Sequence, residues 1–251
     1  SGRELAHAEL IGALLIAGFG TLISLFPFHS WAAPAYASAP APVAMMHAGV
    51  LKKFGLYGLF MFQPLMETGF LPWTNILLVL LVCNVIWVGY VTVNQKRLDL
   101  LLGNSSVMHM GYIFLAFAAL VVSGSAEANP WALKGAALLM LAHGLTIALL
   151  FLLCGQIEKQ TGTLEINSLG GLSTRLPRMA FVFGLAGMAS IGLPGLANFP
   201  GEFMVFFSGF AGFSNGFGPV QIATILCLWG LVIGAVYMLR AYRNIFQGDL
   251  S

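Results

Sequence analysis

Long apolar stretches, separated by short polar or Pro- and Gly-containing segments, run through the whole chain. A transmembrane helix needs about 20 consecutive, mostly apolar residues, and charge, Pro and Gly mark where such a helix ends. This pattern predicts about seven membrane spans, at residues 9–28, 40–62, 72–94, 100–122, 131–156, 177–213 and 219–246. We therefore expect an all-α, polytopic transmembrane helix bundle, with residues 1–251 forming a single transmembrane domain.

Two of the spans contain residues that a continuous helix does not keep. The sixth includes Gly-Leu-Pro-Gly-Leu-Ala-Asn-Phe-Pro-Gly at residues 192–201, and the first ends at Phe-Pro-Phe-His, residues 26–29. We interpret the sixth span as two half-helices around a break, which a membrane tolerates only where the freed backbone faces protein or a water-filled cavity. Two discontinuous helices in the two halves of a chain indicate a transporter with inverted repeats and a pathway at the breaks.

Composition agrees with a membrane protein and excludes other classes. Hydrophobic residues make up 59% of the 251 residues and charged residues only 8%, whereas soluble domains carry about 25% charged residues. A net charge of +2 is too small to indicate nucleic-acid binding. The three cysteines show no CxxC spacing, so we predict no metal site. We also find no signal peptide and no motif of a soluble enzyme, and assign no catalytic residue.

Basic residues gather in the loops of one side of the predicted bundle. That side carries seven of them: Lys96, Arg97, Lys159, Arg175, Arg178, Arg240 and Arg243. The other side carries only Arg3 and Lys134. By the positive-inside rule, we expect the C-terminus on the cytoplasmic side and Ser1 on the opposite side.

Two lysines lie near the middle of the second predicted span, where an ionisable side chain costs several kcal/mol and usually marks an ion pathway. They are Lys52 and Lys53. Adjacent helical residues point about 100° apart, so at most one of the two faces a given channel. Snorkelling toward the membrane surface explains lysines near helix ends and fits this pair poorly.

Histidines in the fourth and fifth spans suit a proton relay, because histidine binds protons near physiological pH. His109 lies about ten residues into the fourth span, and His143 lies at the middle of the fifth. Hydrogen-bonded packing is the alternative role for each of them. His29, at the first break, and His47, in the first third of its span, are secondary candidates, as is Lys52.

Glu202 follows the break in the sixth span, within Phe-Pro-Gly-Glu-Phe. We expect it in the first turn of a half-helix, where a carboxylate complements free N–H groups and the positive end of the helix dipole. That explanation accounts for its position but not for its depth. At a mid-membrane break, Glu202 is a candidate proton or cation exit group.

Six ordered blocks of this sequence resemble the antiporter-like, proton-translocating membrane subunits of respiratory complex I, most closely those of the subunit M (chain 4) type. The blocks are FPFHSW at 26–31, YASAPAPVAMMHAGVLKK at 36–53, SSVMHMG at 105–111, AHGLTIALLFLLCG at 142–155, GGLSTRLP at 170–177 and GLPGLANFPGEF at 192–203. The resemblance implies a piece covering about spans seven to thirteen of a longer proton-conducting subunit. It places the family's central lysine on Lys53, with Lys52 as an extra, and implies a line in the order Lys53, His109, His143, Glu202.

The resemblance also implies an activity and its setting. Such a subunit moves protons across a membrane, coupled to electron transfer from NADH to quinone in the respiratory chain. NADH, FMN, iron–sulfur clusters and quinone would be bound by partner subunits, with no cofactor and no redox chemistry in this chain. The implied partners are other membrane-arm subunits, of the antiporter-like L and N types, together with the lipid bilayer. We expect the inner membrane of a bacterium.

Three positions depart from the family pattern. The family usually has a lysine about nine residues before the Trp of the first block, and this position is Leu22 here. The family's WLPDA motif reads Trp-Ala-Ala-Pro-Ala at 31–35. The lysine of the family's DLKRL motif falls on Asp99. The change at Leu22 concerns the input half of the pathway. Two alternatives therefore stay open: a subunit of a multisubunit cation/proton antiporter, and a structural paralog that does not conduct.

Overall fold

The computed structural model describes residues 7–211 and 216–248, and within these ranges its regular elements are helices. Its main helices are α1 (Ala8–Ile23), α2 (Ala32–Ser38), α3 (Ala41–Met46), the π-helix η1 (His47–Leu51), α4 (Lys52–Phe62), α5 (Glu67–Phe70), α6 (Thr74–Val93), α7 (Leu98–Ser123), α8 (Pro130–Thr161), α9 (Leu172–Arg175), α10 (Pro177–Ile191), α11 (Asn198–Gly209) and α12 (Pro219–Phe246). Short 3-10 turns lie at Gln63–Leu65, Leu71–Trp73 and Ile166–Ser168. The predicted all-α class is confirmed.

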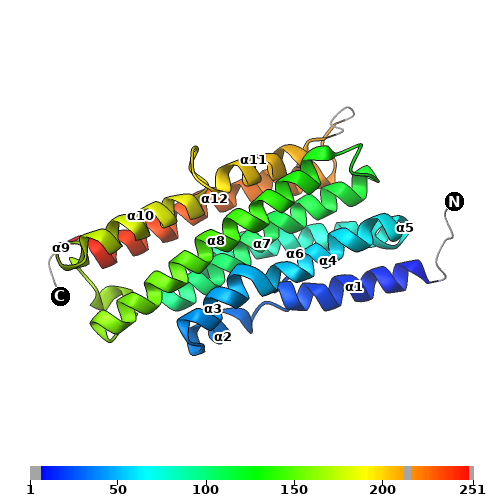
Figure 1. Cartoon of the computed structure of the whole chain (residues 1–251). Coiled ribbons are helices and arrows are strands. Elements are labelled where there is room, and N and C mark those ends of the chain that lie inside the picture. Colours follow the sequence, from blue (N-terminus) through cyan, green and yellow to red (C-terminus); the bar gives the residue numbers. More distant parts are fainter. Residues whose placement is uncertain (1–6, 212–215, 249–251) are drawn as a thin grey trace.

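The seven predicted spans all correspond to helical stretches of one elongated bundle (Figure 1). Among the described residues, four helices are long and apolar enough to cross a membrane by themselves: Thr68–Val93, Leu98–Ser123, Pro130–Thr161 and Pro219–Phe246. The predicted span 9–28 corresponds to the shorter apolar helix α1, which ends at Ile23. The spans 40–62 and 177–213 are composite, because they join three and two shorter helices respectively. The last two residues of the predicted span 177–213 lie outside the described ranges.

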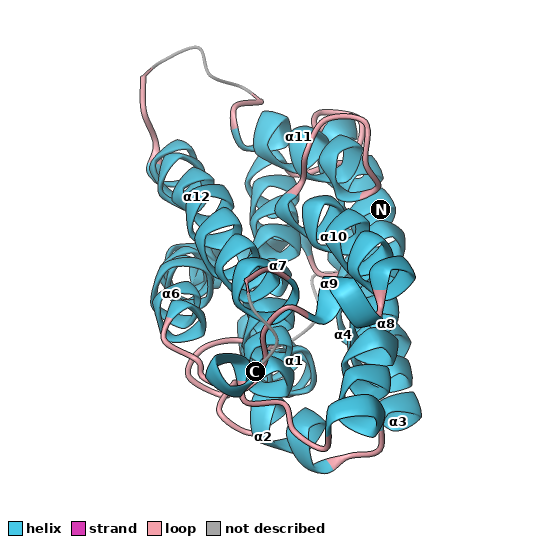
Figure 2. Cartoon of the chain, turned by 90° about the vertical axis from the view of Figure 1, so that its left-hand side faces the viewer, coloured by secondary structure: helices cyan, strands magenta, loops and turns pink. Residues whose placement is uncertain are grey.

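Helix α7 is the centre of the bundle (Figure 2). Every residue from 101 to 121 is buried, because α6, α8, α11, α12 and α2 all pack against this helix. A helix that is apolar all round is expected in such a fully enclosed position. His109 therefore sits in the most enclosed part of the protein, 2% exposed.

The predicted first break separates α1 from α2 and is held by a side chain of α6. Helix α1 ends at Ile23, and the next residue, Ser24, has a φ of 70° in the left-handed region that non-glycine residues rarely adopt. The Asn84 amide donates to the Ser24 carbonyl at 3.1 Å and to the Val107 carbonyl at 3.2 Å, and its oxygen accepts the N–H of Phe26 at 2.5 Å. Protein groups thus satisfy the freed backbone, as a membrane requires.

The second break is shorter than predicted. Helix α10 ends at Ile191, where it is followed by Gly192 with a φ of 78°, and α11 already begins at Asn198. Pro200 fits inside the first turn of α11 because the first four N–H groups of a helix need no intrahelical partner. Glu202 is consequently the fifth residue of α11, and our assignment of it to the first turn was wrong. The positive end of the helix dipole therefore does not explain the position of Glu202, because the dipole effect fades beyond the first turn.

The seven basic residues of the predicted basic side gather at one end of the bundle, where α9 lies and α12 finishes (Figure 1). Only Lys96 and Arg97 lie in a loop, and the other five lie near the ends of α8, α9, α10 and α12, so their assignment to loops was wrong. Loops at that end are joined by hydrogen bonds from the Ile166 N–H to the Lys96 carbonyl, 2.8 Å, and from Arg240 to the Gln95 carbonyl, 2.6 Å. Arg97 pairs with Asp99 at 2.7 Å, and the carboxylate raises the pKa of the Arg97 guanidinium. Lys134 lies in the first turns of α8, at the other end, whereas Arg3 and Ser1 are outside the described residues.

Candidate functional site

Lys53 and His143 meet between α4 and α8. The Lys53 amine lies 3.0 Å from His143 Nδ1 and also donates to the carbonyl oxygen of Ala48. Both side chains are buried, Lys53 with 7% and His143 with 2% of its surface exposed. At 3.0 Å one proton can be shared between the amine and the imidazole, with either group as the donor.

Two glycines and a wide helical turn bring these side chains together. A Cβ on Gly144 would lie 2.6 Å from the Gly49 carbonyl, and a Cβ on Gly49 would lie 3.1 Å from the Gly144 carbonyl. Small residues let membrane helices approach this closely. The π-helix η1 ends just before Lys52, and π turns are frequent at functional sites. The local sequence therefore places Lys53 directly against the middle of α8.

His109 of α7 follows His143 in the site, with 5.1 Å between the ring centroids. Its Nδ1 is 2.7 Å from the Ser105 carbonyl oxygen, and its Nε2 is 2.9 Å from the Ser190 carbonyl oxygen. Carbonyl oxygens only accept hydrogen bonds, and a neutral imidazole has only one N–H. The two ring nitrogens donate to both carbonyl oxygens at once only in the imidazolium form, and the neutral ring donates to one of them.

Glu202 completes the line on the far side of His109. Its Oε1 lies 4.0 Å from His109 Nε2 and has no hydrogen-bond partner among the described residues. The side chain is 2% exposed. A Cβ on Gly192 would collide with the Glu202 carboxylate, so the glycine that ends α10 also makes room for this group. The second break and the carboxylate are thus parts of one site.

The structure brings the four main candidates together but changes their order. We expected His109 next to Lys53 and His143 next to Glu202. Instead His143 contacts Lys53, and His109 lies beside Glu202. The reason is that the side chain of His109, on α7, and not that of His143, on α8, reaches the Ser190 carbonyl at the end of α10. The line therefore runs Lys53, His143, His109, Glu202.

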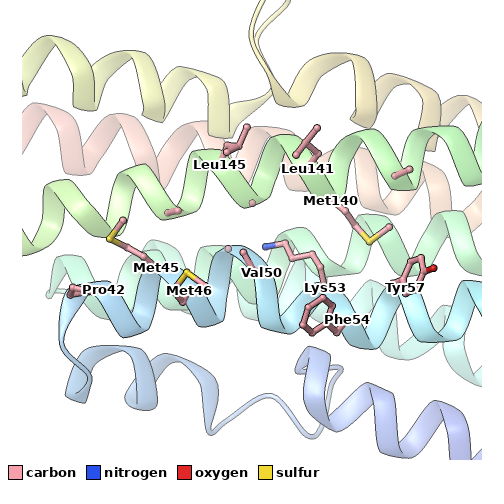
Figure 3. Close-up of a pocket in the computed structure, with 14 residues that line it drawn as sticks. Pro42, Met45, Met46, Val50, Lys53, Phe54, Tyr57, Met140, Leu141 and Leu145 are labelled. Atoms are coloured by element: carbon pink, nitrogen blue, oxygen red, sulfur yellow. The ribbon is translucent and has the colours of Figure 1, made fainter.

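An apolar groove of about 730 Å³ opens beside Lys53, between α8 and the composite span α3–η1–α4 (Figure 3). Its lining residues are Pro42, Met45, Met46, Gly49, Val50, Lys53, Phe54, Tyr57, Ala137, Met140, Leu141, Gly144, Leu145 and Ala148. Figure 3 shows the Lys53 stem in the groove, with its amine directed toward α8. Apolar side chains therefore separate the charged end of Lys53 from the outside of the bundle.

The secondary candidates lie apart from this line, toward α2. Lys52 is 0% exposed, and its amine lies over the Tyr36 ring, 5.5 Å from the centroid. The Tyr36 hydroxyl is 3.2 Å from His47 Nδ1. His29 stacks on Phe26 in the first break, with ring centroids 5.2 Å apart. The two lysines thus face different surroundings, as their adjacent positions on a helix predicted.

Sequence reasoning missed several residues of the site. Asn84, which holds the first break, and Asn198, which begins α11, are both 0% exposed. The Tyr112 ring packs edge-on against His109 at 5.6 Å. Asparagines within apolar spans were the available signal for the first two. The Ser190 carbonyl gave none, because a backbone group next to a break does not show in the sequence.

Comparison with known proteins identifies related chains. A family model described as NADH:quinone oxidoreductase/Mrp antiporter, TM, matches residues 2–230. NAD(P)H-quinone oxidoreductase chain 4 2 of Microcystis aeruginosa is 36% identical over 245 residues, which cover 96% of this chain and 42% of that protein. Chain 4 1 of a Synechococcus species is 34% identical over 247 residues, 97% of this chain and 45% of that protein. The chain thus spans less than half the length of these relatives.

Solved structures show the same fold. A chain of respiratory complex I from Thermus thermophilus with bound NADH matches with a TM-score of 0.86 and 27% identity, over 97% of this chain and 49% of that one. A chain of the Mrp complex from Dietzia sp. matches with a TM-score of 0.85 and 22% identity, over 96% of this chain and 43% of that one. These likenesses confirm an antiporter-like membrane fold.

Proposed function

Because the chain belongs to the NADH:quinone oxidoreductase/Mrp antiporter transmembrane family, we propose that it is part of a proton-translocating membrane subunit of an NADH:quinone oxidoreductase. One observation carries the proposal: the buried line of four ionisable residues from α4 through α8 and α7 to α11. The names of the chain 4 relatives support the choice of complex. Burying four ionisable side chains in a bilayer costs free energy, and residues of this kind within membrane spans usually mark an ion pathway.

Proton transfer starts at the Lys53–His143 pair. The Lys53 ammonium gives its proton to His143 Nδ1 over 3.0 Å, which leaves a neutral amine and an imidazolium. The next step passes the proton between the two imidazole rings, whose centroids are 5.1 Å apart. His109 holds the proton as an imidazolium between two carbonyl oxygens.

Glu202 is the acceptor at the far end. Its free carboxylate oxygen lies 4.0 Å from His109, and opposite charges at about 4 Å attract by about 4 kcal/mol at an effective dielectric constant near 20. The attraction draws a proton to His109, and transfer to Glu202 then neutralises both groups. A charge on His109 repels one on His143, so each step biases the next.

The setting of the subunit follows the resemblance and the loop charges. We propose that L- and N-type antiporter-like subunits are its neighbours in a membrane arm and that NADH, FMN, iron–sulfur clusters and quinone bind elsewhere in the complex. The basic end of the bundle, with the end of α12, would face the cytoplasm of a bacterium.

A cation/proton antiporter is the second candidate function. The likeness to the Mrp complex supports the fold that this function needs. Leu22, which lies on α1 and is 37% exposed, also supports it, because the lysine usual there in complex I subunits is missing. The two candidates differ in dependence on NADH and in the ion that moves.

The experiment is reconstitution of the full-length subunit in its complex in sealed vesicles. We expect NADH oxidation to drive proton uptake, and Glu202→Ala to remove the share of pumping that passes through this subunit. Glu158→Ala is the matched control, because Glu158 is an exposed carboxylate of α8. Sodium-for-proton exchange without NADH would favour the antiporter, and an unchanged proton-to-electron ratio in Glu202→Ala would contradict the pathway.

A further inference from the structure

Lys52 is a buried basic residue that the pathway does not use. It is 0% exposed, and its amine has no hydrogen-bond partner among the described residues. The ion pairs of the described residues join Arg97 to Asp99 and His109 to Glu202, so no described carboxylate compensates a charge on Lys52. Its neighbour Lys53 is directed elsewhere, toward His143.

The surroundings of Lys52 are aromatic and end at a partly exposed imidazole. The Lys52 amine lies over the Tyr36 ring, and the Tyr36 hydroxyl contacts His47 Nδ1 at 3.2 Å. Tyr36 is only 4% exposed, whereas His47 is half-buried. Trp31 and Phe151 close the cluster edge-on, at 5.5 Å from the rings of His47 and Tyr36 respectively. Polar groups thus run from the protein surface to the Tyr36 hydroxyl, on the ring that the Lys52 amine covers.

A permanent charge on Lys52 would be poorly stabilised. Burying an ammonium without a paired charge costs several kcal/mol, and a cation–π contact returns about 0.5–2 kcal/mol. The neutral amine does not have this desolvation cost, and the aromatic ring partly offsets the cost for the ammonium. Lys52 can therefore be either charged or neutral in this environment. The second lysine is adjacent in sequence, so a charge on Lys52 repels a charge on Lys53.

We propose that Lys52 is a second proton-binding residue, which exchanges its proton with the Tyr36–His47 pair and drives the proton of Lys53 toward His143. The Lys52 amine now lies over the face of the Tyr36 ring, so the exchange begins when it moves to the hydroxyl. The His47 imidazolium then gives Nδ1–H to the Tyr36 oxygen, while the hydroxyl proton passes to the Lys52 amine. The products are a neutral imidazole, an intact hydroxyl and an ammonium. This inference rests on the proposed function, because it adds a branch to the same pathway.

Two conservative variants of the full-length subunit in its complex separate proton exchange from a structural role. Tyr36→Phe keeps the ring under the amine but removes the hydroxyl, and Lys52→Arg keeps the charge but cannot release a proton. We expect each to lower proton flux in vesicles several-fold. Tyr90→Phe, at an exposed tyrosine of α6, and Lys134→Arg, at an exposed lysine of α8, are the matched controls and should keep the flux. Wild-type flux in either test variant overturns the proposal.

A direct measurement does not depend on transport. In the complex with ¹⁵N-labelled lysine in nanodiscs, we expect the Lys52 side-chain signal, assigned by its loss in Lys52→Arg, to change from ammonium to amine across the neutral pH range. A signal that stays ammonium throughout overturns the inference. The proposed function and the proposal for Lys52 are tested by different results. Full proton flux in Lys53→Ala would reject the proposed function, whereas the lysine signal would still show whether Lys52 binds and releases a proton.

Discussion

His109 is the residue whose contacts define its charge most closely. Carbonyl oxygens of Ser105 and Ser190 lie 2.7 Å and 2.9 Å from its two nitrogens, and the Glu202 carboxylate lies on the Nε2 side. Three acceptor oxygens thus surround one imidazole, which can donate to two of them at once only as an imidazolium. In the proposed pathway, His109 passes the proton from His143 to the Glu202 carboxylate.

The space around Glu202 gives a prediction at this scale. Gly192→Ala places a methyl group against the Glu202 carboxylate, so we expect the carboxylate to move from His109 and proton flux to fall several-fold, although no ionisable group is lost. Gly195→Ala is the control. Gly195 also has a positive φ, 89°, so both variants share a backbone strain of about 1–2 kcal/mol, but its Cβ meets no atom within 4 Å. Equal flux in the two variants would contradict the expected role of Gly192.

The identities of the site residues were predictable because ionisable side chains stand out in apolar spans. Lys53, His109, His143 and Glu202 all fall on one line. Their order was not predictable from the sequence, because it depends on which helix lies next to the second break. The contact between Lys52 and Tyr36 was hidden for the same reason, since α2 and α4 meet only in the folded bundle.

At the scale of elements, irregular backbone segments lie next to the candidate residues of the pathway. The π-helix precedes the two lysines, and the breaks lie after α1 and α10. Each irregular segment leaves backbone groups that must find partners inside the protein, because lipid offers none. Ser190, just before the second break, uses its carbonyl to hold His109, so the irregular segment also serves the pathway.

Asn84 carries the prediction for the first break. Asn84→Leu leaves the Phe26 N–H and the Ser24 carbonyl without the partner that they have now. An unsatisfied buried group costs on the order of 1–3 kcal/mol, so we expect a lower midpoint of thermal unfolding in detergent. Asn75→Leu, at an exposed position of the same helix, is the control. A midpoint equal to that of the control would show that Asn84 does not hold the break.

The spans themselves were predicted within a few residues, since long apolar runs bounded by Pro, Gly and charge leave little freedom. Helix α12, at Pro219–Phe246, has the predicted bounds. The length of the second break was overestimated because Pro200 and Gly201 are compatible with the first turn of α11. The π-helix had no sequence signal, because its residues also suit a regular helix.

At the scale of the whole molecule, the ionisable residues fall into two groups, one at an end of the bundle and one in its interior. Most basic residues lie at one end of the bundle, whereas the line from Lys53 to Glu202 is enclosed around the central helix α7. A chain of complex I and a chain of the Mrp complex are each similar to almost the whole of this chain. The fold alone does not distinguish the two candidate functions. Proton transport that depends on NADH oxidation distinguishes them.

The most direct test of the pathway is the number of protons moved per NADH oxidised in sealed vesicles, measured for the complex with Lys53→Ala in the full-length subunit. Lys134→Ala, at an exposed position of α8, is the matched control. We predict that Lys53→Ala lowers the ratio to the share pumped by the other subunits, because His143 loses its proton donor, while the control keeps the full ratio. The same full ratio in both variants would contradict a proton pathway through Lys53.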